Sequence, residues 1–249
     1  MGQTEFYRNW IGELWDDLEL YCRDGTEWRI GKKINEKSSL ALAQFISTGK
    51  GAAEAQAVYH CEQIVRGELT GTRAIAKVRM QVPPDFPPSL NPKARAKIAE
   101  EEPAGWTRLE VHSLRYFNEK KCTVVPRLLN VVKSTQDMLH MPVPDGYLVF
   151  LIMEELPGVS LINFWEYDRP KRDRIRASFR RSLTELFSLH GHPVDCKLDN
   201  LIYDESTDKC YFVDFESIWV EEEKRPLKFT DSYYFLWGLA YTINCEDHF

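Results

Sequence analysis

The sequence lacks long apolar runs and an apolar amino terminus. Its longest wholly apolar run is the seven residues from Tyr147 to Met153, whereas a membrane-spanning helix requires about 20. The first ten residues, MGQTEFYRNW, contain no apolar signal-peptide segment, and Phe6 stands where a myristoylation motif has Ser or Thr. These absences predict a soluble, cytoplasmic protein without a membrane partner.

Cysteine pairs of the metal-binding kind are also missing. The six cysteines are scattered, none forms a C-x-x-C pair, and no histidine stands near one at zinc-site spacing. They are therefore predicted to be reduced, mostly buried thiols. Positive charge is in the minority, and the net charge of -6 argues against broad nucleic-acid binding, so no DNA partner is expected.

What the sequence does contain is a set of polar residues at fixed spacing between apolar segments. Asp195 and Asn200 stand five residues apart in a predicted loop, and two short apolar strands follow, 201–203 and 210–213. The second strand ends at Asp214, so the hairpin is expected to place Asp214 beside Asn200. Apolar strands with polar ends are typical of a site whose strands are buried and whose ends face a cleft.

The pattern D-x-K-x-x-N, a hairpin and then D-F resembles the catalytic and metal-binding loops of the protein-kinase-like superfamily. The resemblance implies that Asp195 orients or deprotonates an acceptor hydroxyl, and that Asn200 and Asp214 hold magnesium against nucleotide phosphates. Lys197 would steady the transferring phosphoryl group. The D-F-E ending, with Glu216 in place of the usual Gly, is closer in character to the aminoglycoside and choline kinase branch than to signalling kinases.

Upstream segments follow the order of a nucleotide-covering sheet. Strands are predicted at 57–61 and 74–78, and Gly49 and Gly51 precede them. The resemblance implies that these glycines let backbone N–H groups approach phosphate oxygens and that Lys77 grips the phosphates. Taken alone, the two glycines are typical of a hairpin turn, and a lysine at this position is typical of an edge strand. These residues support the resemblance only through their order in the chain.

A helix is predicted from Trp106, after the proline-rich stretch 83–92. The resemblance implies that Glu110 on this helix pairs with Lys77 and fixes its ammonium group toward the phosphates. A solvated helical glutamate is the alternative. Two further strands are predicted, at 123–129 and 147–153.

A long helix is predicted over 169–189, and its polar face is rich in arginine. A solvated charged face is the default interpretation of such a run. The alternative is a surface that contacts phosphate or RNA. In that alternative a tRNA would be contacted by Arg172, Arg174, Arg176 and Arg180.

Together with the resemblance, these patterns predict a two-lobed, protein-kinase-like α+β fold. Its N-lobe would be an antiparallel sheet with a helix, and its helical C-lobe would be reduced, because only 35 residues follow Asp214. The expected divisions are an N-terminal helical extension at 1–39, an N-lobe at 40–153 with the proline-rich insertion 83–92, and a C-lobe at 154–249 with the catalytic-loop-like segment 194–216.

The resemblance implies an enzyme that moves the γ-phosphoryl group of ATP to a small-molecule hydroxyl, with Mg²⁺ as cofactor. Two other interpretations stay open. One is changed chemistry on the same scaffold, similar to the fungal arginine-containing cyclodipeptide synthases of secondary metabolism, which use aminoacyl-tRNAs; Asp195 or Glu216 would then receive an arginyl guanidinium. Pro193-Val194, in place of the family's usual His-Arg, suits that interpretation. The other is a nucleotide-binding pseudokinase without turnover.

Overall fold

The structure, a computed structural model, describes residues 9–12, 15–39, 53–84, 88–137 and 139–241. The chain divides into two compact units. Unit 1 contains Met1–Arg108 and Leu128–Glu155, and unit 2 contains Leu109–Arg127 and Leu156–Phe249. The predicted division after residue 153 lies near the second boundary. The predicted N-lobe, however, included residues 109–127, which belong to unit 2.

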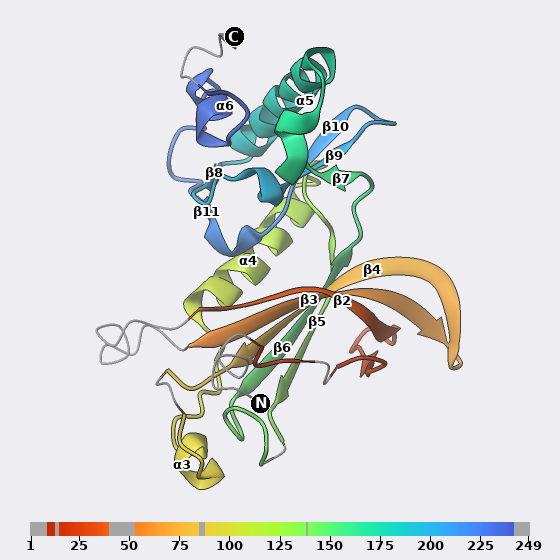
Figure 1. The fold of residues 1–249 in the computed structure, drawn as a ribbon, viewed down its shortest axis with the longest axis vertical. Coiled ribbons are helices and arrows are strands. Elements are labelled where there is room, and N and C mark those ends of the chain that lie inside the picture. The colour runs from red at the N-terminus through yellow and green to blue at the C-terminus, as the bar shows by residue number, and fades with distance from the viewer. Residues whose placement is uncertain (1–8, 13–14, 40–52, 85–87, 138, 242–249) are drawn as a thin grey trace. The chain divides into compact units, whose positions relative to one another are not determined.

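Unit 1 is built on a six-stranded antiparallel sheet with the strand order β1-β2-β3-β4-β6-β5 (Figure 1). The predicted strands at 57–61, 74–78 and 147–153 are confirmed, since they lie within β3, β4 and β6. The strands of this sheet are β1 (Glu19–Tyr21), β2 (Glu27–Ser39), β3 (Glu54–Val65), β4 (Glu68–Gln81), β5 (Leu128–Thr135) and β6 (Tyr147–Glu154).

A two-residue turn sets the pairing of β3 with β4. Arg66 and Gly67 have φ angles of 54° and 81°, and two successive positive φ angles match the right-handed twist of a hairpin. Beyond an irregularity near the turn, the register places Lys77 of β4 opposite Val58 on β3 and Leu151 on β6. Lys77 therefore lies on a strand that is paired on both sides, not on the edge strand of the alternative interpretation.

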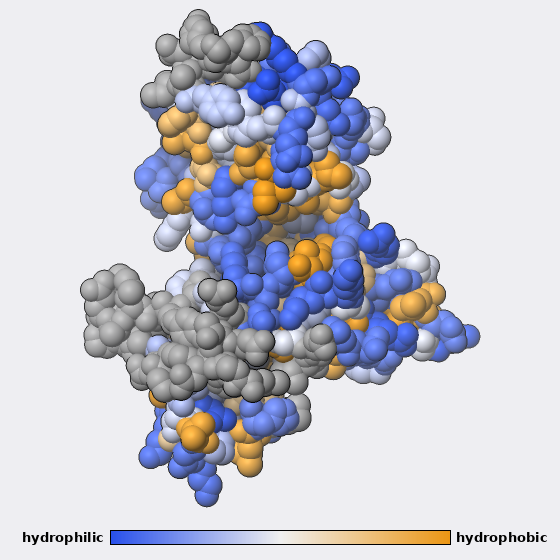
Figure 2. Space-filling view, in the orientation of Figure 1, coloured by the Kyte–Doolittle hydropathy of each residue, from blue (hydrophilic) through white to orange (hydrophobic). Residues whose placement is uncertain are grey.

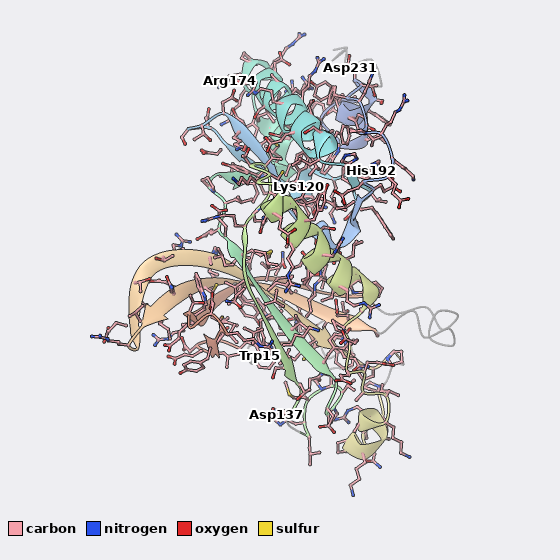
Figure 3. The ribbon with its side chains drawn as sticks, turned by 180° about the vertical axis from the view of Figure 1, so that it is seen from behind. Trp15, Lys120, Asp137, Arg174, His192 and Asp231 are labelled. Carbon is pink, nitrogen blue, oxygen red and sulfur yellow. The ribbon has the colours of Figure 1, made fainter. Side chains whose placement is uncertain are left out.

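The amphipathic helix predicted within the N-terminal extension is wrong for the part of 1–39 that the structure describes. Strands β1 and β2 lie there instead. Gly12 and Asp17 have φ angles of 55° and 63°, which a right-handed helix does not contain. Ile11 and Trp15 are buried because this irregular segment covers the sheet, with the Trp15 ring edge-on to Phe150 at 5.6 Å (Figure 3).

The predicted strand at 123–129 also starts later than expected, because β5 begins at Leu128. Pro126 precedes it, and a proline has no N–H to contribute to a sheet. The apolar residues Val124 and Val125 are buried outside any strand. Their apolar character therefore reflects burial in unit 2, not strand pairing in unit 1.

A buried carboxylate on β3 ties the first turn of helix α4 (Gly105–Glu119) to the sheet. Glu54 is only 2% exposed. Its Oε1 accepts hydrogen bonds from Arg79 at 3.0 Å and from the Trp106 indole at 2.8 Å. Its Oε2 accepts from the hydroxyls of Thr107 at 2.7 Å and Tyr147 at 3.0 Å. A buried charge is stable only when donors surround it in this way.

Glu54→Ala is therefore expected to lower the free energy of unfolding by about 3–5 kcal/mol, because it leaves the guanidinium of Arg79 buried without this carboxylate. Urea denaturation of the full chain measures the loss. The matched control is Glu102→Ala, since the pair between Glu102 and Lys133 is exposed at 3.5 Å and is worth at most about 1 kcal/mol. Equal losses in the two variants would contradict the structural role of Glu54.

In its described residues, unit 2 contains α4 from Leu109 onward, two further helices and two small antiparallel sheets (Figure 1). The helices are α5 (Arg169–Ser188) and α6 (Ser232–Leu236). One sheet has the order β10 (Lys209–Phe212), β9 (Leu201–Asp204), β7 (Val159–Ser160), and the other pairs β11 (Ile218–Val220) with β8 (Gly191–Pro193). Short 3-10 turns are η1 (Leu161–Glu166), η2 (Leu198–Asn200) and η3 (Phe215–Ser217).

Helix α5 is the central element of the unit 2 core and confirms the predicted helix. Asp168 caps its first turn by accepting a hydrogen bond from the Lys171 backbone N–H at 2.9 Å. On its buried face, Phe179 contacts the rings of Phe212 and Trp237 with centroid distances of 5.9 and 5.7 Å. The strands and turns that carry the polar loop residues are thus anchored on α5.

Together, the two units confirm the predicted α+β class with an antiparallel sheet in the first part of the chain. Within unit 1, the short helix α3 (Pro92–Ala96) begins at the end of the proline-rich stretch, and Asn91 caps it. No helix in the described ranges is both long enough and apolar enough to cross a membrane.

Candidate functional site

The loop between β8 and β9 holds three of the predicted site residues in one hydrogen-bonded group. The carboxylate Oδ2 of Asp195 lies 2.8 Å from Lys197 Nζ. The side-chain amide of Asn200 donates to the backbone oxygen of Asp195 at 3.0 Å and to its Oδ2 at 3.4 Å. Asp195 and Lys197 are about half exposed, while Asn200 is buried. The buried amide therefore aims a carboxylate that solvent and ligands can reach.

The β9–β10 hairpin carries the chain back to this loop. Cys210 pairs with Tyr203, and Phe212 pairs with Leu201. Immediately after β10, the backbone N–H of Val213 donates to the carbonyl of Asn200 at 3.0 Å. The expectation that the hairpin places Asp214 beside Asn200 is therefore confirmed at the level of the backbone.

Asp214 itself has a left-handed backbone conformation, with φ 67° and ψ 70°. A non-glycine residue is held there only by the structure around it, at a cost of about 1–2 kcal/mol. Such strained positions cluster at functional sites. The conformation starts η3, which turns the chain toward β11 and brings Glu216 onto the same side as Asp214.

Three carboxylates of unit 2 converge at this point. One oxygen each from Glu110, Asp214 and Glu216 lies within 4.8 Å of the others. Glu110 is 1% exposed, and the other two are partly buried. Carboxylate oxygens are the ligands that magnesium prefers. These residues fit a divalent cation, and Asn200 lies beside them through its backbone bond to Val213.

This grouping differs from the roles predicted for two of its members. The kinase resemblance implied a pair of Glu110 with Lys77, and in the cyclodipeptide-synthase alternative Glu216 or Asp195 would receive an arginyl substrate. Lys77, which is 3% exposed, lies in unit 1 and Glu110 in unit 2, and their pairing stays a prediction. The D-x-E spacing of Asp214 and Glu216 was a visible signal for a shared metal site, whereas the approach of Glu110 depends on the tertiary fold. Gly49 and Gly51 lie outside the described residues.

The arginine-rich face of α5 makes contacts inside unit 2. Arg176 is buried, and its guanidinium donates to Asp173 and to the Leu239 carbonyl, each at 2.8 Å. Figure 2 shows strongly hydrophilic side chains over the region where Figure 1 places α5, and Figure 3 shows Arg174 on that helix. The other predicted tRNA contacts also have internal neighbours: Arg174 lies 3.5 Å from Glu205, Arg172 stacks over Trp165, and Arg180 stacks over Phe229.

These internal contacts account for much of the basic run without a nucleic acid. Opposite charges and aromatic rings offset the arginine charges locally. Contact with tRNA stays a prediction, and no additional contact is needed to explain why these arginines stand on α5.

Cysteine chemistry beside the loop is disfavoured. Burial raises the pKa of Cys196, the neighbour of Asp195, to about 11. The reactive form of cysteine is the thiolate, so at neutral pH Cys196 is a protonated, unreactive thiol. The described cysteines are free thiols, as predicted.

Comparisons with known proteins give similarity to kinases at the level of structure only. No protein-family model matches the chain, and no curated protein matches its sequence. One similar solved structure is the Cydia pomonella granulovirus kinase PK-1, with 17% identity and a TM-score of 0.45; the alignment covers 85% of this chain and 65% of that chain. Vaccinia related kinase 3 has 9% identity and a TM-score of 0.43, with coverages of 87% and 56%.

A third similar structure is the bifunctional kinase-methyltransferase WbdD, with 20% identity, a TM-score of 0.38, and coverages of 61% and 31%. The chain thus spans less than two thirds of each of these three proteins. Because the TM-scores are below 0.5, these similarities do not indicate a function for this chain. Evidence for a function has to come from the residues themselves. The narrower resemblance to aminoglycoside and choline kinases stays a prediction.

Proposed function

We propose that this chain is a kinase-like phosphotransferase that moves the γ-phosphoryl group of ATP to a hydroxyl of a small molecule. The observation that carries the proposal is the hydrogen-bonded group of Asp195, Lys197 and Asn200, with Asp214 placed next to it by the Val213–Asn200 bond. Each of these residues has an isolated structural explanation. A shared function best explains why these residues converge in one unit and follow the order of a phosphotransfer site.

In this proposal, Asp195 acts on the acceptor. Its carboxylate is accessible and is oriented by the Asn200 amide, so it can accept the proton of a bound hydroxyl or align that hydroxyl for attack. Lys197, which pairs with Asp195 in this structure, would balance negative charge on the phosphoryl group during its transfer. Asp195 would thus act on the acceptor hydroxyl, and Lys197 would act on the phosphoryl group.

Asn200 and Asp214 would hold the magnesium ion, and Glu110 or Glu216 can supply further oxygen ligands. When bound, magnesium neutralises the charge of the nucleotide phosphates. Repulsion among the three carboxylates falls when a cation lies between them. Lys77 is buried on the paired strand β4, and a role for it in nucleotide binding stays a prediction from the resemblance.

A small acceptor is supported by the short path that follows Asp214. The chain passes through η3 and β11, and β11 pairs directly with β8. Beyond β11, Glu222 contacts Tyr116 and Lys120 of α4, at 3.2 Å each. A short segment that pairs within unit 2 supports a small acceptor over a protein substrate that would need an extended platform.

Transfer of label from γ-labelled ATP to a mixture of hydroxylated small molecules tests the proposal. We expect labelled product with the wild-type chain and magnesium, and none when EDTA removes the metal. Nucleotide binding without any transfer would favour the pseudokinase alternative. Absence of nucleotide binding would leave aminoacyl-tRNA as the next substrate to examine.

A further inference from the structure

One face of α4 within unit 2 is completely buried. Glu110, Ser113, Leu114 and Phe117 recur at i, i+3, i+4 and i+7, and each is at most 1% exposed. The Phe117 ring lies edge-on to Phe215 with a centroid distance of 5.8 Å. This face of α4 therefore packs on η3, the turn that carries Glu216.

A single hydroxyl on this face bonds to the strand that follows η3. Ser113 Oγ donates to the carbonyl of Ile218 at 2.7 Å. Ile218 lies opposite Pro193, and in the neighbouring pair the Val194 N–H donates to the Ser217 carbonyl at 3.0 Å. Because hydrogen-bonded and non-hydrogen-bonded pairs alternate in an antiparallel ladder, Ile218 belongs to a non-hydrogen-bonded pair. Its carbonyl therefore points away from β8, toward Ser113.

The same register explains why a proline is tolerated in β8. At a non-hydrogen-bonded position, Pro193 needs no N–H for the ladder. The Ile218 carbonyl does need a donor, because it is buried with its residue. The sequence departure at Pro193 thus leaves the ladder intact, and Ser113 supplies the bond that joins β11 to α4.

We propose that Ser113 is a positioning residue for the carboxylates of Glu110, Asp214 and Glu216. Ser113 lies one helical turn from Glu110, and Ile218 lies two residues from Glu216 in the sequence. The Ser113–Ile218 bond therefore fixes how far α4 can rotate or slide against the segment that carries the other two carboxylates. This inference rests on the proposed function, in which those carboxylates serve a divalent cation.

A metal site made of carboxylates needs contacts such as the Ser113–Ile218 bond to hold its ligands together. Three carboxylates within 4.8 Å repel one another before a cation binds, so their backbones have to be held together by other contacts. A second contact along the same helix comes from Glu222, whose carboxylate accepts from Tyr116 and pairs with Lys120 near the end of α4 (Figure 3). It is exposed and contributes less than the buried serine.

The test compares Ser113→Ala with Ser178→Ala. Ser178 is 1% exposed on α5 and donates to the Asp208 carbonyl at 2.8 Å, so both variants lose a buried bond from a serine hydroxyl to a backbone carbonyl. Each is expected to lower the melting temperature of the full chain by about 2–4 °C. The two are distinguished by Mn²⁺ affinity, measured on the full chain by electron paramagnetic resonance.

Ser113→Ala is expected to weaken Mn²⁺ binding by about 10- to 100-fold, the usual effect of losing a residue that orients metal ligands. Ser113→Cys, similar in shape but a weak donor, is expected to fall between wild type and Ser113→Ala. Ser178→Ala should bind Mn²⁺ like the wild type. If the wild type binds Mn²⁺ and the two alanine variants bind it with equal affinity, Ser113 has no positioning role. The proposed function would still stand in that case. No Mn²⁺ binding by the wild type would overturn both.

Discussion

Asp195→Asn is expected to lower phosphoryl transfer by about 10²- to 10⁴-fold, the usual contribution of a general base, with little change in nucleotide binding. An asparagine amide cannot accept the proton of a hydroxyl as a carboxylate does. The loop should keep its shape, because the Asn200 amide also donates to the backbone oxygen of residue 195 at 3.0 Å. The loss would thus belong to the chemical step.

Steady-state kinetics with ATP and the identified acceptor measure this effect as a fall in kcat with a nearly constant KM for ATP. The matched control is Asp199→Asn, a change of the same kind at an exposed position in the same loop. It should leave kcat close to the wild-type value. Near-normal turnover in Asp195→Asn would remove Asp195 from the proposed mechanism.

Asp214→Asn is expected to have the second large effect, on metal binding. Replacing one anionic oxygen ligand by an amide lowers the charge of the group formed with Glu110 and Glu216, and hard divalent cations favour charged oxygen ligands. We expect Mn²⁺ affinity to fall by at least about tenfold, since a ligand should matter no less than the residues that orient it.

Mn²⁺ titration of the full chain measures this loss. Asp231→Asn is a suitable control, because Asp231 is an exposed aspartate of unit 2 that precedes α6 and makes no side-chain capping bond there (Figure 3). The same loss of affinity in both variants would show that general charge, and not the proposed site, attracts the ion.

Local patterns predicted the elements of this fold well where one periodicity dominates a segment. The strands predicted at 57–61 and 74–78 lie within β3 and β4, and the apolar run 147–153 predicted β6. Helix α5 has a clear apolar stripe that ends in Phe179, Leu183 and Leu186 on its buried face. In each case the residues that define the pattern are also those that the unit buries.

Predictions failed where burial came from irregular backbone. Ile11 and Trp15 are spaced as on a helix, yet Gly12 and Asp17 break it with positive φ angles. Apolar residues continue past Leu236, yet α6 ends there, because Gly238 has a left-handed φ of 72°. Helical spacing alone does not separate a helix from a segment laid over a sheet.

For the site, the sequence indicated the residues of one loop but not all their partners. Asp195, Asn200 and Asp214 are close in sequence or joined by a hairpin, so their approach followed from local geometry. Glu110 comes from a helix about one hundred residues earlier, and only the packing of α4 on η3 brings it to Asp214. Spacing in the sequence carries no information about such long-range contacts.

The most direct test of the account is the melting temperature of the wild-type chain with ATP at millimolar concentration, with magnesium and with EDTA. Ligand at about 100 times its Kd stabilises the folded state by about 2.7 kcal/mol, which raises the melting temperature of a chain of this size by about 5–10 °C. We predict this rise with magnesium, and we expect most of it to be lost with EDTA. No rise in either condition would contradict a magnesium-dependent nucleotide site in this protein.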